Sequence, residues 1–556
     1  MSFVRTGTAV LRQYRPYGNA PPPTPDFTNT AEAFKTKTTK EILRSYLVYK
    51  MFTFEGIVSR SQKLIKVSRT LLGQTLFNKV MRATIYGQFV GGEDVAELKP
   101  TISRLKASGV HPILDYAVEE DIPEKEVVME IRQKDTPLNP TYGDTHPQFK
   151  PTNSPGDFVV RSSARTYFYK DEEKCDQNME HFLHCINCAA DASEGTDAFA
   201  AVKVTGLGRT EFLLRLSEVV VGSKDLFSKL AGSDDVTTAQ ITPASFYAGL
   251  HTMGFQVSES TSERLFKELD QSKLGRVSWF NWSSNFQPSL EIHKMFRTTK
   301  GSKGRFLLAT LDEEEQRQMR SMVARAETLA ECASNRGVRM MIDAEQTYFQ
   351  PAIHHLTVHT LMPKYNSKKP IVYNTIQAYL KDSGSALRQD FATSDIMGFS
   401  YGMKLVRGAY MEQERYHASQ KGYPDPIFGT KGGTDENYER LLVALLQRVQ
   451  SGRTHIMVAT HNEQSVQMAI NRMKELGINP ADGTVVFAQL LGMRDHISFP
   501  LGQAGYRVYK YMPYGPVSEV IPYLLRRANE NKASLDGADH ERELLYSELK
   551  RRLFAH

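Results

Sequence analysis

Two adjacent arginines near the end of the chain, Arg526 and Arg527, follow two tyrosines in an order that suits the binding of a small anion. An apolar strand pattern with Tyr511 runs into a turn of Gly and Pro, and a helical pattern with Tyr523 then leads to the arginines. A guanidinium is a planar fork of donors that matches a carboxylate, and two of them can hold one carboxylate from two directions. A solvated helix face would also carry such a pair. If the tyrosine side faces a pocket, the segment predicts a carboxylate-binding site.

Charged residues also end several apolar runs earlier in the chain. Lys203 ends AFAAVKVTG, Asp343 ends VRMMIDAEQ, and Lys404 and Arg407 lie in YGMKLVRGAY. Burying an unpaired lysine is costly, so Lys203 either faces solvent at an edge or meets an anion. A carboxylate would repel a substrate carboxylate beside it. We therefore expect Asp343 to orient cations and tyrosines rather than to bind substrate, although a salt bridge that only caps a strand would look the same.

Runs of this kind recur eight times and are separated by helical patterns such as NEQSVQMAINRMKELG. They cover 111–120, 198–206, 338–346, 371–380, 401–410, 455–462, 484–493 and 505–515. Parallel strands need crossover connections, usually helices. Eight such alternations predict an α/β fold, a (β/α)8 barrel, in which reactive residues gather at the carboxyl ends of the strands. An open doubly wound sheet is the alternative, but no GxGxxG follows the first run.

The other segments divide the chain around this barrel. A capping-box pattern from Thr38 to Glu41 opens an N-terminal helical arm, and PPPTP marks the end of a tail that we expect to be disordered or to serve in targeting. The expected divisions are the tail 1–35, the arm 36–110, the FAD-binding barrel 111–221 and 301–535, an inserted helical segment 222–300, and a C-terminal helix 536–556.

The inserted segment resembles an EF-hand that has lost its ligands. Asp270 would be the first loop position and Gly275 the sharp turn, but Leu274 and Asn281 stand at positions five and twelve. A working calcium loop uses several carboxylates and a bidentate Glu at its end. We therefore expect a degenerate helix–loop–helix, held by Trp279 and Trp282, that does not bind calcium.

Composition excludes several classes of protein. No apolar run approaches the roughly 18 residues of a membrane span, and a net charge of +6 over 556 residues does not indicate nucleic-acid binding. Four cysteines are too few for a disulfide scaffold. Cys185 and Cys188, near His181 and His184, could suggest zinc, but their helical spacing does not close four ligands, so we expect ordinary thiols and no metal.

The runs together resemble the proline dehydrogenase family over about residues 111–531, most specifically toward the C-terminal end. The resemblance implies a flavoenzyme that oxidises L-proline to Δ1-pyrroline-5-carboxylate by hydride transfer to non-covalent FAD, with electrons passed to a quinone. It also implies a mitochondrial protein on the matrix side of the inner membrane, in peripheral contact with that membrane, and an oligomer is possible. A first stretch of 25 residues with three arginines and no acidic residue is compatible with a transit peptide.

The same resemblance assigns roles to individual residues. Asp343 and Lys404 would be catalytic. Residues that bind substrate would be Lys203, Tyr410, Leu490, Tyr511, Tyr523, Arg526 and Arg527. Residues that bind the cofactor would be Ala344, Gln377, Arg407, Gly408, Ala409, Thr460, His461 and Glu530. Many relatives carry the two cations of KLVRGAY in the opposite order, so we expect two cations near flavin and pyrophosphate rather than a fixed role for each.

Two other functions stay open. Hydroxyproline dehydrogenase is the nearest, and its members tend to carry a smaller Ser at the position of Tyr511, which favours proline for this chain. A calcium-responsive binding protein built around 222–300 would rest on one degenerate loop. Composition, periodicity and spacing alone predict an α/β-barrel enzyme with a cationic pocket, and the flavin and the substrate come from the resemblance.

Overall fold

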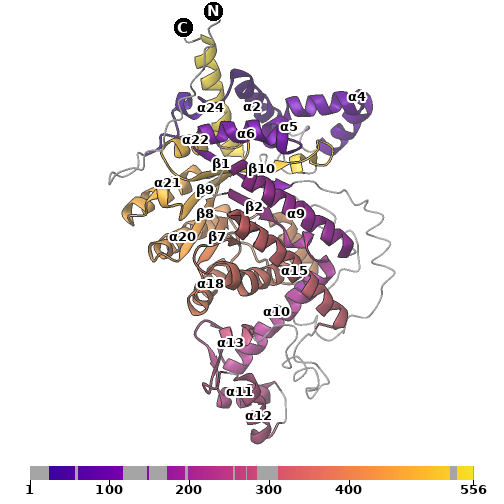
Figure 1. Cartoon of the computed structure of the whole chain (residues 1–556), viewed down its shortest axis with the longest axis vertical. Helices are drawn as coiled ribbons and strands as arrows, with labels where there is room; N and C mark the ends of the chain where they lie inside the picture. Colours follow the sequence, from indigo (N-terminus) through magenta and orange to yellow (C-terminus); the bar gives the residue numbers. More distant parts are fainter. Residues whose placement is uncertain are drawn as a thin grey trace, which may run out of the picture.

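A closed barrel of eight parallel strands forms the centre of the molecule (Figure 1). The computed structural model describes residues 24–54, 56, 60–116, 147–149, 172–193, 198–253, 257–270, 272–284, 311–521, 523–525 and 535–554. The barrel strands are β1 (Val110–Tyr116), β2 (Ala198–Val202), β5 (Val338–Ile342), β6 (Val372–Gln377), β7 (Tyr401–Val406), β8 (Thr454–Ala459), β9 (Val485–Leu490) and β10 (Val508–Tyr514). Their order around the barrel is β1-β10-β9-β8-β7-β6-β5-β2, which confirms the predicted (β/α)8 barrel.

Helices connect successive strands on the outside of the barrel. They are α9 (Glu172–Ser193), α10 (Thr210–Ala231), α15 (Glu313–Arg336), α16 (Gln350–His354), η3 (His355–Leu361), α17 (Met362–Tyr365), α18 (Ser383–Met397), α19 (Met411–Lys421), α20 (Lys431–Gln450), α21 (Glu463–Glu475) and α22 (Asp495–Gln503), with short turns η1 (Pro147–Phe149), η2 (Val204–Gly206) and η4 (Pro480–Asp482). The sequence of α15 explains its length: Asp312 and Glu315 form a capping box at its start, and Gly337 ends it in the left-handed conformation.

Side chains alternate along each strand between the barrel interior and the surrounding helices. In β10, Tyr509 and Tyr511 point into an interior cluster that also contains Phe199 and Met341. Val508 and Met512, of the opposite parity, belong to the large outer core beneath the helices. Tyr511 therefore stands at the top of the packed interior, toward the carboxyl ends of the strands.

The N-terminal arm and the C-terminal helix pack together at one end of the molecule (Figure 1). The arm comprises α1 (Thr30–Ala33), α2 (Thr39–Phe52), α4 (Ser61–Ala83), α5 (Ile85–Phe89) and α6 (Val95–Ala107), and the C-terminal helix is α24 (Leu535–Phe554). The predicted capping box between Thr38 and Glu41 opens α2. Tyr49 of α2 shares a small core with Leu545 and Leu549 of α24, so the two ends of the chain stabilise each other.

The inserted segment lies at the far end of the long axis from α24 (Figure 1). It comprises β3 (Gln240–Ile241), α11 (Pro243–Thr252), α12 (Glu259–Leu269), β4 (Val277–Ser278) and α13 (Trp279–Ser284), and β3 pairs antiparallel with β4. The indole of Trp282 donates to Ser223 of α10 at 2.8 Å. Helix α10 crosses residue 222 without a break, so the barrel and the insert share it.

The loop that resembles an EF-hand is closed by its own hydrogen bonds. The Asp270 carboxylate accepts from the Ser272 hydroxyl at 2.9 Å and from the backbone N–H groups of Leu274 at 3.1 Å and Gly275 at 2.6 Å. Leu274 itself is exposed. The loop therefore keeps an EF-hand-like turn, and its one carboxylate is hydrogen-bonded to the loop backbone.

Candidate active site

Asp343 is the centre of the candidate site. It directly follows β5, and its N–H donates to the carbonyl of Val202 at the end of β2, which sets it beside Lys203. Lys404 points from β7 and donates to Asp343 Oδ1 at 2.5 Å, while Lys203 Nζ lies 3.4 Å from Oδ2. Asp343 and Lys404 are both buried. Two of the predicted cations thus meet the predicted carboxylate at the carboxyl ends of three strands.

Tyr511 closes this cluster from the other side of the barrel. Its hydroxyl donates to Asp343 Oδ2 at 3.2 Å, and Lys404 Nζ lies 5.9 Å from its ring centroid, within the range of a cation–π contact. Asp343 thus contacts two lysines and a tyrosine, the kinds of residue that the sequence analysis expected it to orient. Its role in catalysis stays a prediction.

The charges of the cluster stabilise one another. Burial alone would raise the pKa of Asp343, but Lys404 and Lys203 outweigh burial and hold it below its ordinary value. Burial would likewise lower the pKa of Lys203, but Tyr410 and Asp343 raise it above its ordinary value. Both groups are therefore charged near neutral pH, and a carboxylate held in this way is a poor proton acceptor.

A second carboxylate, Glu345, fixes the loop that follows Asp343. It is fully buried and accepts from Thr205, through the N–H at 3.1 Å and the hydroxyl at 2.7 Å. Gln377, at the end of β6, donates its side-chain amide to the Glu345 carbonyl at 2.9 Å. Burial raises the pKa of Glu345 despite nearby Lys203 and these donors. The contacts hold the ends of β2, β5 and β6 together.

Aromatic and aliphatic side chains border the charged cluster. Tyr410 is buried where α19 begins, and Tyr523 is buried in a cluster with Phe89 and Val90 of the arm, against which Leu490 packs. The N–H of Leu490 donates to His461 Nε2 at 3.1 Å, so a neutral His461 ring carries its proton on Nδ1. His461 thus fixes the backbone that presents Leu490.

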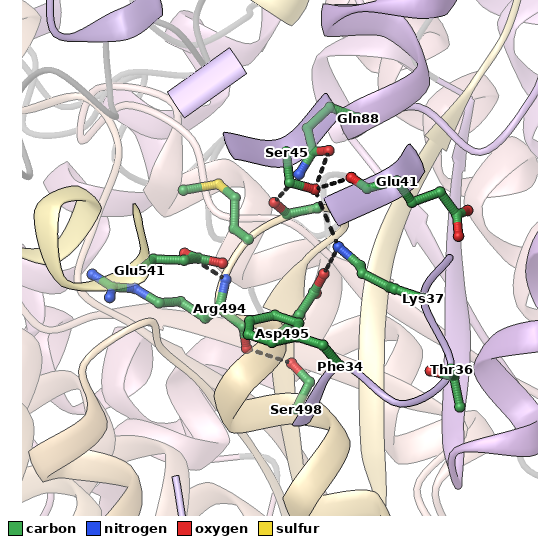
Figure 2. A network of polar contacts seen from close by, with 12 residues as sticks. Phe34, Thr36, Lys37, Glu41, Ser45, Gln88, Arg494, Asp495, Ser498 and Glu541 are labelled. Carbon is green, nitrogen blue, oxygen red and sulfur yellow. Dashed lines mark hydrogen bonds and ion pairs between the residues drawn. The ribbon is translucent and has the colours of Figure 1, made fainter. Parts of the chain in front are cut away.

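The turn after Leu490 is shaped by the N-terminal arm. Gly492 has φ of 75°, and a Cβ there would lie 2.0 Å from the carbonyl oxygen of Gln88, so only glycine fits. Its own carbonyl accepts from the Gln88 amide at 2.7 Å and from the Tyr49 hydroxyl at 3.0 Å. The amide oxygen of Gln88 accepts from the Ser45 hydroxyl of α2 at 2.8 Å (Figure 2). The arm therefore positions one wall of the site.

Arg407 is bound by a different set of residues from those around Asp343. Its guanidinium donates to Asp435 at 2.7 Å, to the Thr460 hydroxyl at 2.6 Å and to Ser465 at 3.1 Å, and it stacks on Tyr438 with 4.4 Å to the ring centroid. Lys404 and Arg407, the two cations predicted to lie near one cofactor, therefore have different partners. Their placement near a cofactor stays a prediction.

The turn after Arg407 runs very close to a neighbouring ring. Gly408 has φ of 139°, and a Cβ there would lie 2.5 Å from the Tyr379 ring. Ala409 follows in the same turn and, like Gly408, is exposed, whereas Ala344 is buried beside Asp343. Backbone groups of this turn can therefore approach a bound molecule closely.

Comparison with known proteins supplies the family. The sequence model described as proline dehydrogenase matches residues 171–540, more than half of the chain. The chain belongs to the proline dehydrogenase family. It is 42% identical over 546 residues to the human protein named proline dehydrogenase 1, mitochondrial, covering 96% of this chain and 90% of the human one. Membership of the family makes this chain an oxidoreductase.

Other relatives of this chain are named for two different substrates, proline and hydroxyproline. Proline dehydrogenase 1, mitochondrial, of Drosophila melanogaster is 40% identical and covers 95% of this chain and 80% of the fly protein. Hydroxyproline dehydrogenase of Xenopus laevis is 34% identical and covers 94% and 89%. A solved structure of proline utilization A from Bdellovibrio bacteriovorus, inactivated by N-propargylglycine, matches with a TM-score of 0.51 at 16% identity. It covers 93% of this chain, which spans 40% of that protein, and it supports the fold alone.

Three predicted site residues of this family member, Arg526, Arg527 and Glu530, lie outside the described residues. Sequence reasoning missed the partners that fix the others, among them Thr205 and Asp435. Thr205 could have been found, because it lies two residues beyond Lys203 at the same strand end. Asp435 is 28 residues from Arg407 on a separate helix, and no spacing rule links the two.

Proposed function

We propose that this chain oxidises L-proline to Δ1-pyrroline-5-carboxylate with a non-covalently bound FAD and passes the electrons to a quinone. The observation that carries the proposal is the convergence of Lys203, Lys404 and Tyr511 on the buried carboxylate of Asp343. Family membership supports the reaction class. The human relative named for proline is 42% identical, whereas the Xenopus relative named for hydroxyproline is 34% identical.

Lys203 is the cation best suited to receive the substrate carboxylate. Its 3.4 Å separation from Asp343 exceeds the roughly 2.7–3.2 Å of an N–H···O hydrogen bond, whereas Lys404 bonds Asp343 directly. Lys203 can therefore turn toward an incoming carboxylate while Lys404 keeps Asp343 paired. Arg526 and Arg527 would complete the clamp.

The residues at the ends of β6, β7 and β8 fit a flavin nucleotide. The amide of Gln377 can donate and accept, as the edge of an isoalloxazine ring requires, and Lys404 would place positive charge near the ring. Gly408 lets the backbone come close, and Ala344, Ala409, Thr460, His461 and Glu530 would complete the set. The guanidinium of Arg407 already donates to Asp435 and Thr460. Arg407 would therefore act indirectly, by holding the Thr460 side chain in position. When bound, the flavin supplies the hydride acceptor.

The chain's own residues would then orient the substrate and keep water out. Tyr410, Leu490, Tyr511 and Tyr523 would border the pyrrolidine ring. Asp343 stays ionised because its pKa is lowered, so it would hold the lysines and the Tyr511 hydroxyl in place rather than take a proton. The substrate amine would bind in its neutral form.

The arm offers a surface that supports peripheral contact with a membrane. Helix α4 contains five Lys or Arg residues and no Asp or Glu. Exposed large apolar side chains gather on α2 and α4: Leu43, Leu47, Leu64, Val67, Leu71, Leu72, Leu76 and Val80. Exposed apolar side chains interspersed with basic residues would favour contact with the surface of an anionic membrane. Within the described residues, no helix is long and apolar enough to cross a bilayer.

The inner side of the same helix borders the candidate site. Phe77 and Met81 of α4 belong to the cluster that contains Tyr523 and packs against Leu490. A lipid-soluble quinone at the membrane surface would thus be near the site. Relatives named as mitochondrial support a place in mitochondria, and we propose the matrix side of the inner membrane.

The absorption spectrum of the purified protein tests the reaction. Flavin bands should be present, acid precipitation should release the flavin, and L-proline should bleach it under anaerobic conditions more readily than trans-4-hydroxy-L-proline. Protein that lacks flavin bands after reconstitution with FAD, or that only hydroxyproline bleaches, would contradict the proposal.

Co-sedimentation with vesicles that contain an anionic lipid tests the membrane contact. Leu71→Glu should weaken binding because Leu71 is 78% exposed on α4. Leu274→Glu is the matched control, since Leu274 is 65% exposed on the distant insert. Equal binding by both variants and the wild type would show that α4 is not the contact.

A further inference from the structure

Three side chains of the types that bind metal ions come together from three separate helices. They are Glu463 at the start of α21, His496 in α22 and His540 in α24. One ligand atom from each lies within 4.8 Å of the others. Residues this far apart in sequence come together only through the fold, and in the described part of the chain no other group of three or more such residues has this spacing.

His496 is the observation that points to a ligand. It is fully buried, its Nδ1 has no hydrogen-bond partner, and its Nε2 has only the Glu463 carboxylate nearby, at an ion-pair distance of 3.6 Å. Buried polar groups are almost always paired, and each exception calls for a physical cause such as a bound water or ion. The long contact to Glu463 and the unpaired Nδ1 of His496 call for such a cause.

The distance between His496 and Glu463 fits a shared ion. His496 Nε2 lies 3.6 Å from Glu463 Oε2, beyond the length of a hydrogen bond. Two ligands that each lie about 2.0–2.1 Å from one tetrahedral zinc are about 3.3 Å apart. A shift of a few tenths of an ångström would bring these two ligand atoms to that separation, and the His540 side chain, within 4.8 Å of both, would turn toward the same ion.

Neighbouring contacts already hold these backbones in place. Figure 2 shows Arg494 and Asp495, which precede His496, beside Glu541, which follows His540. The Arg494 N–H donates to the Glu541 carboxylate at 3.0 Å, and the Tyr49 hydroxyl donates to it at 3.1 Å. The rings of His496 and His540 then lie 5.6 Å apart between centroids. The ligands are thus presented by a fixed frame.

We propose that Glu463, His496 and His540 bind a divalent transition-metal ion, with zinc as the ion that two imidazoles and a carboxylate suit. Three protein ligands leave one position for water, which exposed His540 makes accessible. The ion would fasten the C-terminal helix to the two barrel helices that follow His461 and Leu490. This role is structural and does not depend on the proposed reaction.

Equilibrium dialysis of the full-length flavin-loaded protein against zinc chloride, followed by elemental analysis, tests the site. His540→Asn is the decisive variant, because His540 is exposed and its loss should leave the fold intact. The wild type should bind one more zinc ion than the variant. Loss of an outer partner of a metal ligand already costs about 10–100-fold in affinity, so losing a ligand should weaken binding at least tenfold.

His251→Asn is the matched control, since His251 is also an exposed helical histidine, and it should bind zinc as the wild type does. Zinc should raise the unfolding temperature of the wild type and of this control, and raise it less for His540→Asn and Glu463→Gln. Equal zinc content and equal thermal shifts in His540→Asn and the wild type would overturn the proposal, as would a wild type that binds no zinc at micromolar concentrations.

Discussion

Replacing Tyr511 with serine separates the two contributions that this side chain makes to the site. Its hydroxyl donates to Asp343, and its ring stands on the interior cluster below Lys404. Burial and nearby carboxylates raise its pKa well above the ordinary value, so the phenol keeps its proton and donates. A hydrogen bond to a charged group contributes about 1.5–3 kcal/mol. One packing contact in an apolar pocket contributes about 1–3 kcal/mol to discrimination, or roughly 10–200-fold.

Tyr511→Phe is the matched variant, because it removes the hydroxyl and keeps the ring. We expect Tyr511→Phe to lower kcat/KM for L-proline and trans-4-hydroxy-L-proline by similar factors. Tyr511→Ser should in addition shift the ratio of the two kcat/KM values toward hydroxyproline by roughly 10–200-fold, since it makes room beside the ring carbon that carries the hydroxyl. Steady-state assays with an artificial electron acceptor measure both ratios. A wild type that prefers hydroxyproline, with a serine variant of unchanged preference, would refute the reasoning.

Three further predictions concern other parts of the chain. Arg527→Met should raise KM for proline strongly, because losing a charged partner of a bound carboxylate costs about 2–5 kcal/mol; a change below about threefold in steady-state kinetics would remove the clamp. Calcium should show no micromolar binding in calorimetric titration, because the Asp270 carboxylate already bonds its own loop, and a Leu274→Asp, Asn281→Glu variant should gain affinity as the positive control. Burial raises the pKa of Glu414 to about 7 although Thr347 donates to it, so the native state keeps a proton that the unfolded state releases from about pH 4.5 upward. Stability should therefore fall by up to about 3 kcal/mol as pH rises to about 7, and Glu414→Gln should flatten this slope in urea unfolding series.

The barrel could be predicted from the sequence because its signal is local. Each strand is a short apolar run, and the eight runs recur between helical patterns, so the count and order follow without any knowledge of long-range contacts. The residues at which the strands end were harder to predict from the sequence. The run 198–206 leaves the barrel after Val202 and turns through η2, and the N–H of Asp343 donates to the Val202 carbonyl at this point. That hydrogen bond joins residues 141 positions apart and leaves no local trace.

The candidate site was predictable in its residue types and less so in its contacts. Charged residues at strand ends predicted a cationic pocket, and Asp343, Lys404 and Tyr511 do meet at those strand ends. The different surroundings of Lys404 and Arg407 were not foreseen, because they depend on Asp435 from another helix. The clamp residues Arg526 and Arg527 stay a prediction.

Lys510 is a buried lysine that the sequence could also have revealed, because burying an unpaired lysine is costly. The sequence places it inside an apolar strand, as it does Lys203, and it is fully buried on the outer face of β10. It lies 2.8 Å from Asp495, which also pairs with Lys37 of the arm (Figure 2). Burial lowers the pKa of Lys510 even beside Asp495, while the two lysines outweigh burial and lower the pKa of Asp495.

Breaking such a buried pair by removing one partner typically costs about 3–5 kcal/mol, because a charge is left unpaired in the interior. Lys37 belongs to the arm, and Asp495 follows the turn that carries Leu490. The buried charges therefore hold the arm against this wall of the site. Gln88 and Tyr49 of the arm, which donate to the Gly492 carbonyl, attach the arm to the same turn a second time.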